Sequence, residues 1–327
     1  IFPSKHRSSP KKPQPPTTHP TLAFTLLHSP RAPPAPSSSQ APPASIEVHE
    51  DDCPTFPNLS LIERAPHLTV ISEMPVTVTS ATASYADWPG KVIGMIVLKA
   101  DESVEDDLRR LLTLQTRCHI SRIESPDTID EDSLTELAAR IARSSALLPS
   151  ASKLCCAAFA CTSASCVIGS DRVSALIREG CKAETTTNPL LASVASCHGL
   201  SVETLGLVTP YVREVNSVMI DQFSQVGGIT VTCLVSFGED EDAKVARIDP
   251  ESIYRAAVDL AAQNKGKFDA LFLSCTNLRT LDIINRIEEE TGLPCLSSNL
   301  CMIWHMAKLG GFALNRDFSC RLTRESR

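Results

Sequence analysis

Runs of apolar residues alternate with segments of helical periodicity in the first half of the chain. The continuous apolar run 92–98 and the run of small and apolar residues 154–160 have the length of buried strands. Apolar residues recur at helical spacing in the segments 101–115, 133–148 and 170–181. Such alternation predicts a parallel sheet with helices on its faces.

The second half repeats this pattern. Apolar strand-length runs occupy 205–210, 229–237 and 270–274. Helical patterns occupy 211–228, 249–265 and 278–292. Glycines follow the first and third of these helices, as is common at helix ends, and an Asp-Pro pair opens the second.

A Cys-Thr pair follows the last strand of each half. The distance from Val97, near the end of the first strand, to Cys161 is 64 residues, and from Val208 to Cys275 it is 67 residues. The same order of elements and nearly the same spacing predict a duplicated α/β unit. Ligands of open parallel sheets bind beyond the carboxyl ends of the strands. We therefore expect two pseudo-symmetric lobes whose two cysteines approach one ligand from opposite sides.

A cysteine between a strand and a helix lies near the positive end of the helix dipole, which lowers its pKa. The backbone N–H groups there favour an anion. Thr162, Ser163, Thr276 and Asn277 add donors beside the two thiols, so we expect a small carboxylate as the ligand. One thiolate could then attack a carbon or take a proton while the opposed thiol donates one.

Two other interpretations of the cysteines stay open. A free cysteine is often simply a buried small apolar residue, and this is our interpretation of the other eleven of the 13 cysteines. A redox disulfide between Cys161 and Cys275 is the second alternative, although no CxxC motif supports it. Cys301 and His305 stand four residues apart on an expected helix, but without a second pair of ligands we expect no metal there.

Composition divides the chain. Residues 1–46 contain 12 of the 23 prolines, five Lys or Arg and no acidic residue, which indicates a disordered segment and is compatible with an organellar transit peptide or an untargeted tail. We extend this segment to residue 68. Residues 47–327 contain all 38 acidic residues and 26 Lys or Arg, a net charge of −12 (26 − 38).

This acidic body gives no support for nucleic-acid binding. No apolar run has the roughly 18 residues needed to cross a membrane. The odd cysteine count favours a reduced, intracellular location, cytoplasmic or organellar if residues 1–46 are a transit peptide. The acidic run 239–242 is expected to be a solvated loop, with a place at the pocket rim as the alternative. A homo-oligomer is compatible with the sequence.

The stretches "FACTSASCVIGSDRVSALI", "TTTNPLLASV", "LVTPYVREVN", "VARIDPESI" and "LSCTNLRTLDIINRIEEETGLPCLSSNL" resemble the aspartate/glutamate racemase superfamily. The most similar branch contains maleate cis-trans isomerase, arylmalonate decarboxylase and ectoine-utilisation proteins. The resemblance covers about residues 90–311. It implies an α/β fold of two flavodoxin-like lobes with the active site between them, and enzymes that need no cofactor.

The resemblance also implies roles for single residues. Cys161 and Cys275 match the two cysteines that racemases and isomerases of the superfamily use, with the first as nucleophile and the second as acid. Decarboxylases typically have glycine at the first position, so the cysteine pair favours an isomerase or racemase acting on a small carboxylic acid. Decarboxylation, hydrolysis and non-catalytic carboxylate binding or thiol sensing stay open as alternatives. The carboxylate-binding donors match four residues: Thr162, Ser163, Tyr211 and Thr276.

Two departures from the family pattern matter. Asp101 stands where maleate isomerases typically have an asparagine that binds a substrate carboxylate, and its charge would repel a second carboxylate. Asp101 therefore favours a substrate with one carboxylate, or with an amino or amide group. The chain after Gly311 is not recognisable. We expect a first lobe at 69–187 that is completed by a helix at 299–311, a second lobe at 188–298, and a tail at 312–327.

Overall fold

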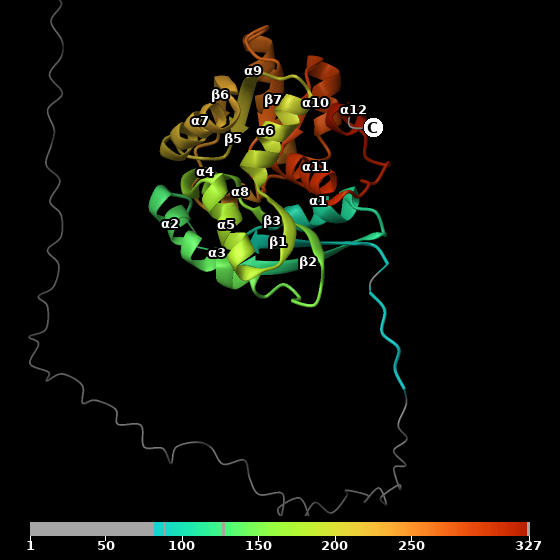
Figure 1. Cartoon of the computed structure of the whole chain (residues 1–327). Coiled ribbons are helices and arrows are strands. Elements are labelled where there is room, and N and C mark those ends of the chain that lie inside the picture. The colour runs from blue at the N-terminus through green and yellow to red at the C-terminus, as the bar shows by residue number, and fades with distance from the viewer. Residues whose placement is uncertain (1–81, 88, 126–127, 326–327) are drawn as a thin grey trace, which may run out of the picture. The chain divides into compact units, whose positions relative to one another are not determined.

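The computed structural model of the protein describes residues 82–325, apart from residues 88, 126 and 127. The expected disordered segment 1–68 therefore lies outside the described residues. The described part forms two parallel four-stranded sheets, each flanked by helices (Figure 1). The predicted α/β class and its two similar lobes are confirmed.

The first sheet has the strand order β2-β1-β3-β4, and all of its pairings are parallel. Its strands are β1 (Lys91–Leu98), β2 (Thr116–Ile123), β3 (Leu154–Ala160) and β4 (Ala183–Thr187). The helices of this part of the chain are α1 (Val104–Leu111), α2 (Glu131–Glu136), α3 (Ala138–Ser145), α4 (Thr162–Ile168), α5 (Ser170–Gly180) and α6 (Pro189–Gly199). Every residue of β3 is buried, which explains its uninterrupted run of small and apolar residues.

The second sheet has the equivalent order β6-β5-β7-β8 and is also parallel throughout. Its strands are β5 (Thr204–Thr209), β6 (Thr230–Ser236), β7 (Ala270–Leu273) and β8 (Cys295–Ser297). The remaining helices are α7 (Arg213–Gly227), α8 (Asp242–Val245), α9 (Pro250–Gln263), α10 (Ile284–Thr291), α11 (Ser298–Gly310) and α12 (Arg321–Glu325). As predicted, α7 ends at a glycine pair and α10 ends at Gly292; Gly228 and Gly292 have the left-handed conformation that favours this residue.

Helices cover both sheets. Helices α3 and α5 pack together against the first sheet, and α11 packs against β3, β4 and α1. Figure 1 shows α11, in red, beside α1 although nearly 200 residues separate them. In the second lobe α9 packs against β5, β6 and β7, and the rings of Phe223 and Phe272 meet edge to face at 5.4 Å.

The chain after Gly311 is packed rather than free. Leu314 pairs with Leu112 in an isolated bridge, and Cys320 and Leu322 are buried. The buried carboxylate of Glu288 accepts the backbone N–H of Arg321, which fixes the start of α12. This segment was expected to be a tail, and that expectation is wrong for residues 312–324, because their apolar side chains and backbone have partners in both lobes.

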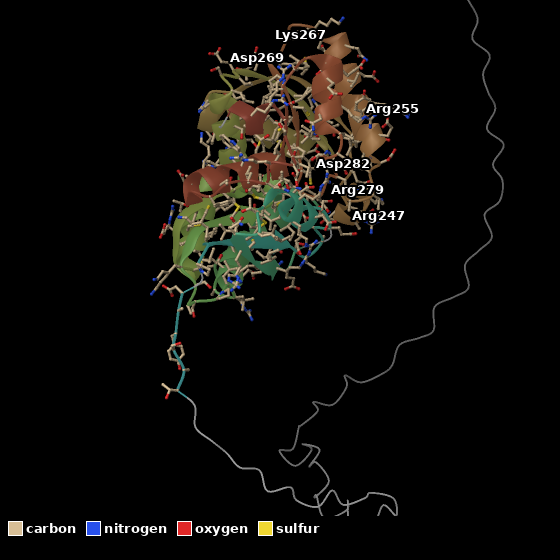
Figure 2. All side chains as sticks on the ribbon, turned by 90° about the vertical axis from the view of Figure 1, so that its right-hand side faces the viewer. Arg247, Arg255, Lys267, Asp269, Arg279 and Asp282 are labelled. Atoms are coloured by element: carbon tan, nitrogen blue, oxygen red, sulfur yellow. The ribbon has the colours of Figure 1, made fainter. Side chains whose placement is uncertain are left out.

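Two ion pairs join the lobes at the surface. Arg247 contacts Glu102 at 2.9 Å, and Arg110 contacts Asp282. Figure 2 shows Arg247, Arg279 and Asp282 close together where the second lobe meets the first. Exposed pairs of this kind contribute only about 0–1 kcal/mol each, so buried contacts must hold the interface.

Candidate active site

Cys161 lies directly between β3 and α4 and is 4% exposed. Its backbone is extended, with φ −153°, and α4 begins at the next residue. The sulfur lies 3.5 Å from the hydroxyl of Ser163, and the hydroxyl of Ser165 donates to the Cys161 carbonyl. The predicted junction of strand, cysteine and helix is therefore correct at this motif.

Cys275 follows β7 but does not begin a helix. It has φ 151°, and with Ser201 it is one of the two non-glycine residues in the described chain with positive φ. Its sulfur accepts the backbone N–H of Asn277 at 3.4 Å. Turns occupy the chain until α10 begins at Ile284, so the predicted helix 278–292 starts six residues late. The helix-dipole argument therefore does not hold for Cys275.

Ser298 joins the two motifs. Its hydroxyl oxygen accepts the hydroxyl of Thr162 at 2.8 Å and the backbone N–H of Cys275 at 3.1 Å. The hydroxyl of Thr276 adds a weak contact of 3.4 Å to the carbonyl of Ala160. The structure thus brings the two Cys-Thr pairs together across the lobe interface, as expected, through a serine that we had not predicted.

Burial raises the pKa of both thiols. The pKa of Cys161 rises to about 12, although Ser163 and the N–H of Ala164 act in the opposite direction. The pKa of Cys275 rises well above its ordinary value, chiefly by burial and then by the charge of Asp242. The predicted lowering of these pKa values is wrong, because loss of water outweighs the nearby N–H groups. The raised pKa values favour the protonated thiol at both positions at neutral pH.

Tyr211 is fully buried beside the two cysteines. Its carbonyl accepts the side chains of Asn216 and Ser236, which fixes the start of α7. Its hydroxyl lies beside the thiol of Cys275, has no partner among the described residues that meets hydrogen-bond geometry, and has a pKa raised chiefly by burial. Tyr211 is therefore a buried residue at the interface of the lobes and not a solvated loop tyrosine.

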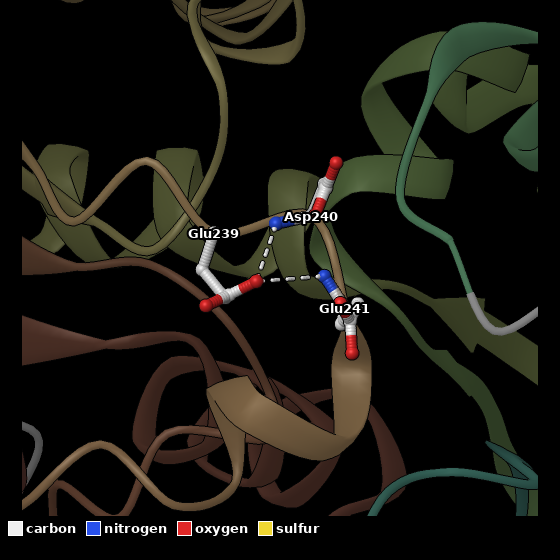
Figure 3. A group of neighbouring side chains, drawn as sticks. All are labelled: Glu239, Asp240 and Glu241. Atoms are coloured by element: carbon white, nitrogen blue, oxygen red, sulfur yellow. Dashed lines mark hydrogen bonds between the residues drawn. The ribbon is translucent and has the colours of Figure 1, made fainter. Parts of the chain in front are cut away.

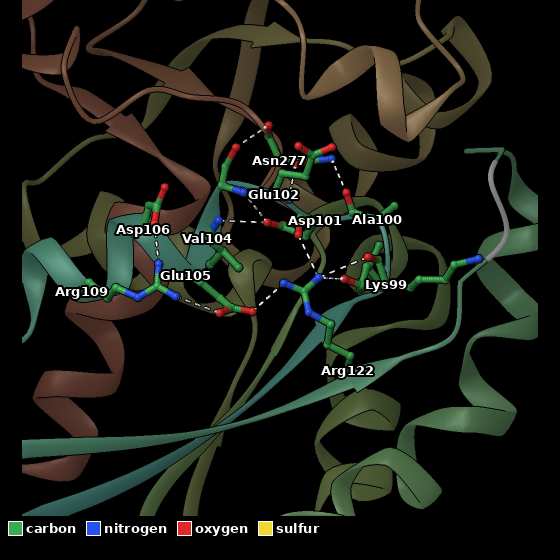
Figure 4. A network of polar contacts seen from close by, with 12 residues as sticks. Lys99, Ala100, Asp101, Glu102, Val104, Glu105, Asp106, Arg109, Arg122 and Asn277 are labelled. Atoms are coloured by element: carbon green, nitrogen blue, oxygen red, sulfur yellow. Dashed lines mark hydrogen bonds and ion pairs between the residues drawn. The ribbon is translucent and has the colours of Figure 1, made fainter.

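Asp101 lies at the carboxyl end of β1 and caps α1. Its Oδ1 accepts the backbone N–H groups of Ser103 and Val104, each at 2.9 Å. Figure 4 shows this cap beside Arg122, whose guanidinium donates to the carbonyl of Asp101. The Oδ2 atom is buried and has no hydrogen-bond partner among the described residues. Burial raises the pKa of this carboxyl.

The side chain of Asn277 joins the lobes. Its oxygen accepts the N–H of Glu102 at 2.8 Å, and its amide donates to the carbonyls of Ala100 and Asp242, each at 3.1 Å (Figure 4). We had predicted a donor to the substrate. In the structure these bonds tie the loop after β1 to the loop after β7 and so position the two sides of the site.

The acidic run contains the second residue that sequence reasoning missed. Asp240 and Glu241 are exposed as expected, and Figure 3 shows one carboxylate oxygen of Glu239 accepting their two backbone N–H groups. Asp242, in contrast, is buried at the start of α8. Its charge raises the pKa of both active-site cysteines, so it lies close to each. Sequence reasoning had treated all four acids as one solvated group.

Cys301 and His305 do not share a ligand position. Nδ1 of His305 lies 2.8 Å from the hydroxyl of Thr187, and burial lowers its pKa to about 4. Cys301 lies beside the hydroxyls of Ser196 and Ser193 instead. Within the described chain, the carboxylates of residues 239–241 are the one group with metal-binding spacing, and Lys244 already pairs with Glu241 at 2.6 Å.

The model of the arylmalonate decarboxylase family matches residues 93–322, more than two thirds of the chain. The chain belongs to the arylmalonate decarboxylase family. The expected resemblance is confirmed, and the match continues beyond residue 311, where we had expected it to end. The relatives and solved structures that match this chain have the names of enzymes.

Two relatives of this family match part of the sequence. The maleate isomerase of Geobacillus stearothermophilus is 26% identical over 110 residues, 33% of this chain and 42% of the relative. The arylmalonate decarboxylase of Bordetella bronchiseptica is 30% identical over 128 residues, 39% of this chain and 52% of the relative. These matches span about half the length of each relative and include both reaction types.

Solved structures share the fold over nearly their whole length. The Nocardia farcinica maleate cis-trans isomerase bound to TRIS has a TM-score of 0.62 and 21% identity, covering 72% of this chain and 98% of that one. A cysteine-to-serine mutant of the same enzyme carries a covalently bound succinylcysteine intermediate, with TM-score 0.63, 21% identity and the same coverage. A liganded double mutant of arylmalonate decarboxylase has TM-score 0.61 and 23% identity, covering 71% and 98%.

None of the helices in the described chain is long and apolar enough to span a membrane.

Proposed function

We propose that the protein is a cofactor-independent isomerase or racemase of a small carboxylic acid and that Cys161 and Cys275 are its catalytic pair. The observation that carries this proposal is the connection of Thr162, Ser298 and Cys275, which holds both Cys-Thr motifs against one another at the carboxyl ends of β3 and β7. Two thiols facing one ligand provide an attacking group and an acid without a cofactor.

For an unsaturated acid the proposed steps are addition, rotation and elimination. Cys161 loses its proton to a buried acceptor, for which the carboxylate of Asp242 is close enough to affect its pKa. The thiolate adds to one carbon of the double bond, and the electron pair moves onto the conjugated carboxylate, which accepts a proton from Cys275. After rotation about the new single bond, Cys275 takes its proton back, the double bond re-forms and the thiolate leaves. The covalent succinylcysteine of the structural neighbour supports a covalent step of this type.

The carboxylate would be held by the donors around the thiols. Tyr211 has a buried hydroxyl without a hydrogen-bond partner among the described residues, and Ser163 lies beside Cys161. The hydroxyls of Thr162 and Thr276, which contact Ser298 and the carbonyl of Ala160 in this structure, lie next to the two cysteines and would turn to the ligand. Donors fixed in a site without water stabilise developing charge far better than they do in water. This arrangement supports charge stabilisation by the protein alone.

Decarboxylation is the second candidate, because the family model and one relative are named for it. In this reaction a carbon–carbon bond breaks, carbon dioxide leaves, and Cys275 protonates the remaining enediolate. Cys161 would then be dispensable, as glycine is typical at that position in such enzymes. Activity that requires Cys275 and persists in Cys161→Gly would favour this candidate over the isomerase.

Proton NMR in deuterated water tests the proposal. We would offer maleate, its monoamide, amino acids and aryl-substituted malonates to the wild-type protein. Geometric conversion without deuterium uptake indicates addition to the double bond, and uptake next to the carboxylate indicates racemisation or decarboxylation. Turnover that survives either Cys161→Ala or Cys275→Ala would contradict the two-thiol mechanism, and ligand binding without any turnover would support a binding protein instead.

A further inference from the structure

We propose that Asp101 makes this site selective for a substrate that presents an N–H group, an amide or an ammonium, in the position where a diacid would present its second carboxylate. The inference rests on the proposed function for the carboxylate end of the substrate. It concerns the other end, for which the structure provides acceptors rather than donors.

The carboxyl of Asp101 is fixed in one orientation. Its Oδ1 accepts two backbone N–H groups at the start of α1, so the group cannot turn without losing both bonds. Its Oδ2 is consequently held in a buried position without a partner among the described residues. A buried oxygen of a carboxylate that makes no hydrogen bond is costly, and a ligand donor removes that cost.

No donor among the described residues meets hydrogen-bond geometry at Oδ2. The guanidinium of Arg122 is the cation that acts on Asp101, but its N–H groups bind the carbonyls of residues 98, 99 and 101 and the carboxylate of Glu105 (Figure 4). Thr276 is the neighbouring donor: its hydroxyl lowers the pKa of Asp101, and its acceptor within hydrogen-bond geometry is the carbonyl of Ala160 at 3.4 Å.

The buried acids around the site also favour an N–H donor over a second carboxylate. Asp101 and Asp242 are both buried and both act on Cys161, and Asp107 is a third buried acid next to Asp101. Burial raises the pKa of Asp101, and it raises that of Asp107 to about 7, so a further negative charge beside these acids is disfavoured. An amide or ammonium in that place would instead donate to Oδ2.

Asp101→Asn is a sharp test because it changes one atom. The backbone N–H groups of Ser103 and Val104 require an oxygen, so the asparagine must keep its carbonyl at the Oδ1 position. Its NH₂ group then replaces Oδ2, and an acceptor becomes a donor. Asp106→Asn is the matched control, because it makes the same change of charge on an exposed residue of α1 that pairs with Arg109.

Binding is measured by titration calorimetry with succinate and succinamate, which differ only in carboxylate against amide and have no double bond to react. We expect the wild type and Asp106→Asn to bind succinamate at least about 10-fold more tightly than succinate, and Asp101→Asn to reverse this preference. Equal or tighter binding of succinate by the wild type would overturn the inference, as would an unchanged preference in Asp101→Asn with a native circular dichroism spectrum.

If Asp101→Asn does not fold, the same binding measurement is made on Asp101→Ser, because serine can cap a helix and has no charge. We expect its ratio of the two affinities to fall to about 1, and retention of the amide preference in this variant would refute the inference. Turnover of maleamate and maleate, followed separately, tests the proposed function. A reversed binding preference without cysteine-dependent turnover would leave Asp101 as the specificity residue of a binding site.

Discussion

The two Cys-Thr motifs are alike in sequence and differ in backbone. Cys161 is extended and precedes a helix at once, whereas Cys275 has positive φ and is followed by turns until Ile284. The sulfur of Cys161 therefore faces the first amides of α4, while that of Cys275 accepts one N–H from Asn277 and lies beside Tyr211. The two motifs share the position of the thiol at the sheet edge and not the way it is held.

The two Cys-Thr motifs therefore have different structural roles at the lobe interface. The loop of Cys275 also carries Asn277, which ties that lobe to the loop after β1. The Cys161 motif makes its contact across the interface through Thr162 and Ser298. We infer that the second motif holds the lobes together as well as presenting a thiol, and that its strained backbone, worth about 1–3 kcal/mol, is maintained by those bonds.

The largest expected effect comes from removing either thiol. Cys161→Ala and Cys275→Ala should each lower turnover by at least about 10³-fold, because nucleophile and acid act as one unit and neither replaces the other. Turnover is measured on the substrate found by NMR, with Cys166→Ala in α4 as the control for a buried thiol outside the pair. A loss in one variant only would contradict the two-thiol mechanism, and a loss in Cys275→Ala alone would favour decarboxylation.

The next effect concerns the pKa of the two thiols. At pH 8 a thiol with a pKa of about 12, as for Cys161, has roughly 10³ times less thiolate than a free cysteine. Alkylation by iodoacetamide, followed by peptide mass spectrometry, should therefore be slower by at least that factor at both positions and should still rise tenfold per pH unit between pH 8 and 10. Half-buried Cys233 on β6 is the internal control for reagent access.

A rate at Cys161 or Cys275 that levels off near pH 8.5 would contradict the shift. It would mean that the site opens to water often enough to restore an ordinary thiol. A plateau at one cysteine only would show that the two lobes protect their thiols unequally.

Sequence patterns predicted five of the eight strands in the described chain, because β1, β3, β5, β6 and β7 are apolar runs. No residues were assigned to β2, whose buried and exposed positions alternate irregularly, or to the short strands β4 and β8. The start of α10 was misjudged because Leu278 and Leu281 fit a helical period, while the Asn277 bonds to the other lobe, which no local pattern contains, fix a turn.

The same limit applies to the site. The cysteines were found because their context is repeated, and Asp101 and Tyr211 through the resemblance to the racemase superfamily. Ser298 also follows a strand, β8, so the rule that ligands gather at carboxyl ends could have found it. No sequence pattern marked Asp242, because only its burial in the fold distinguishes it from the three acidic residues before it.

A moderate effect is expected from the bridge between the motifs. Ser298→Ala removes the acceptor for Thr162 and for the N–H of Cys275, which leaves two buried donors unpaired. We expect a loss of about 2 kcal/mol in unfolding free energy and a fall of 10- to 100-fold in kcat, since both motifs shift. Urea unfolding and steady-state kinetics measure these, and Ser193→Ala, buried in α6, is the control. Wild-type kinetics in Ser298→Ala would show that the motifs are held independently.

The smallest expected effect is a difference in stability that distinguishes the backbone conformations at Cys161 and Cys275. At Cys275, φ 151° suits glycine and strains any residue with a Cβ, so Cys275→Gly should be about 1 kcal/mol more stable than Cys275→Ala. At Cys161, the extended backbone accepts alanine without strain, and Cys161→Gly should be about 0.5–1 kcal/mol less stable than Cys161→Ala because glycine loses more entropy on folding. Each pair differs by one methyl group, so urea unfolding compares the sites directly. The same sign at both positions would mean that the two motifs share one backbone conformation in solution, whereas opposite signs confirm that different backbone conformations hold the two thiols.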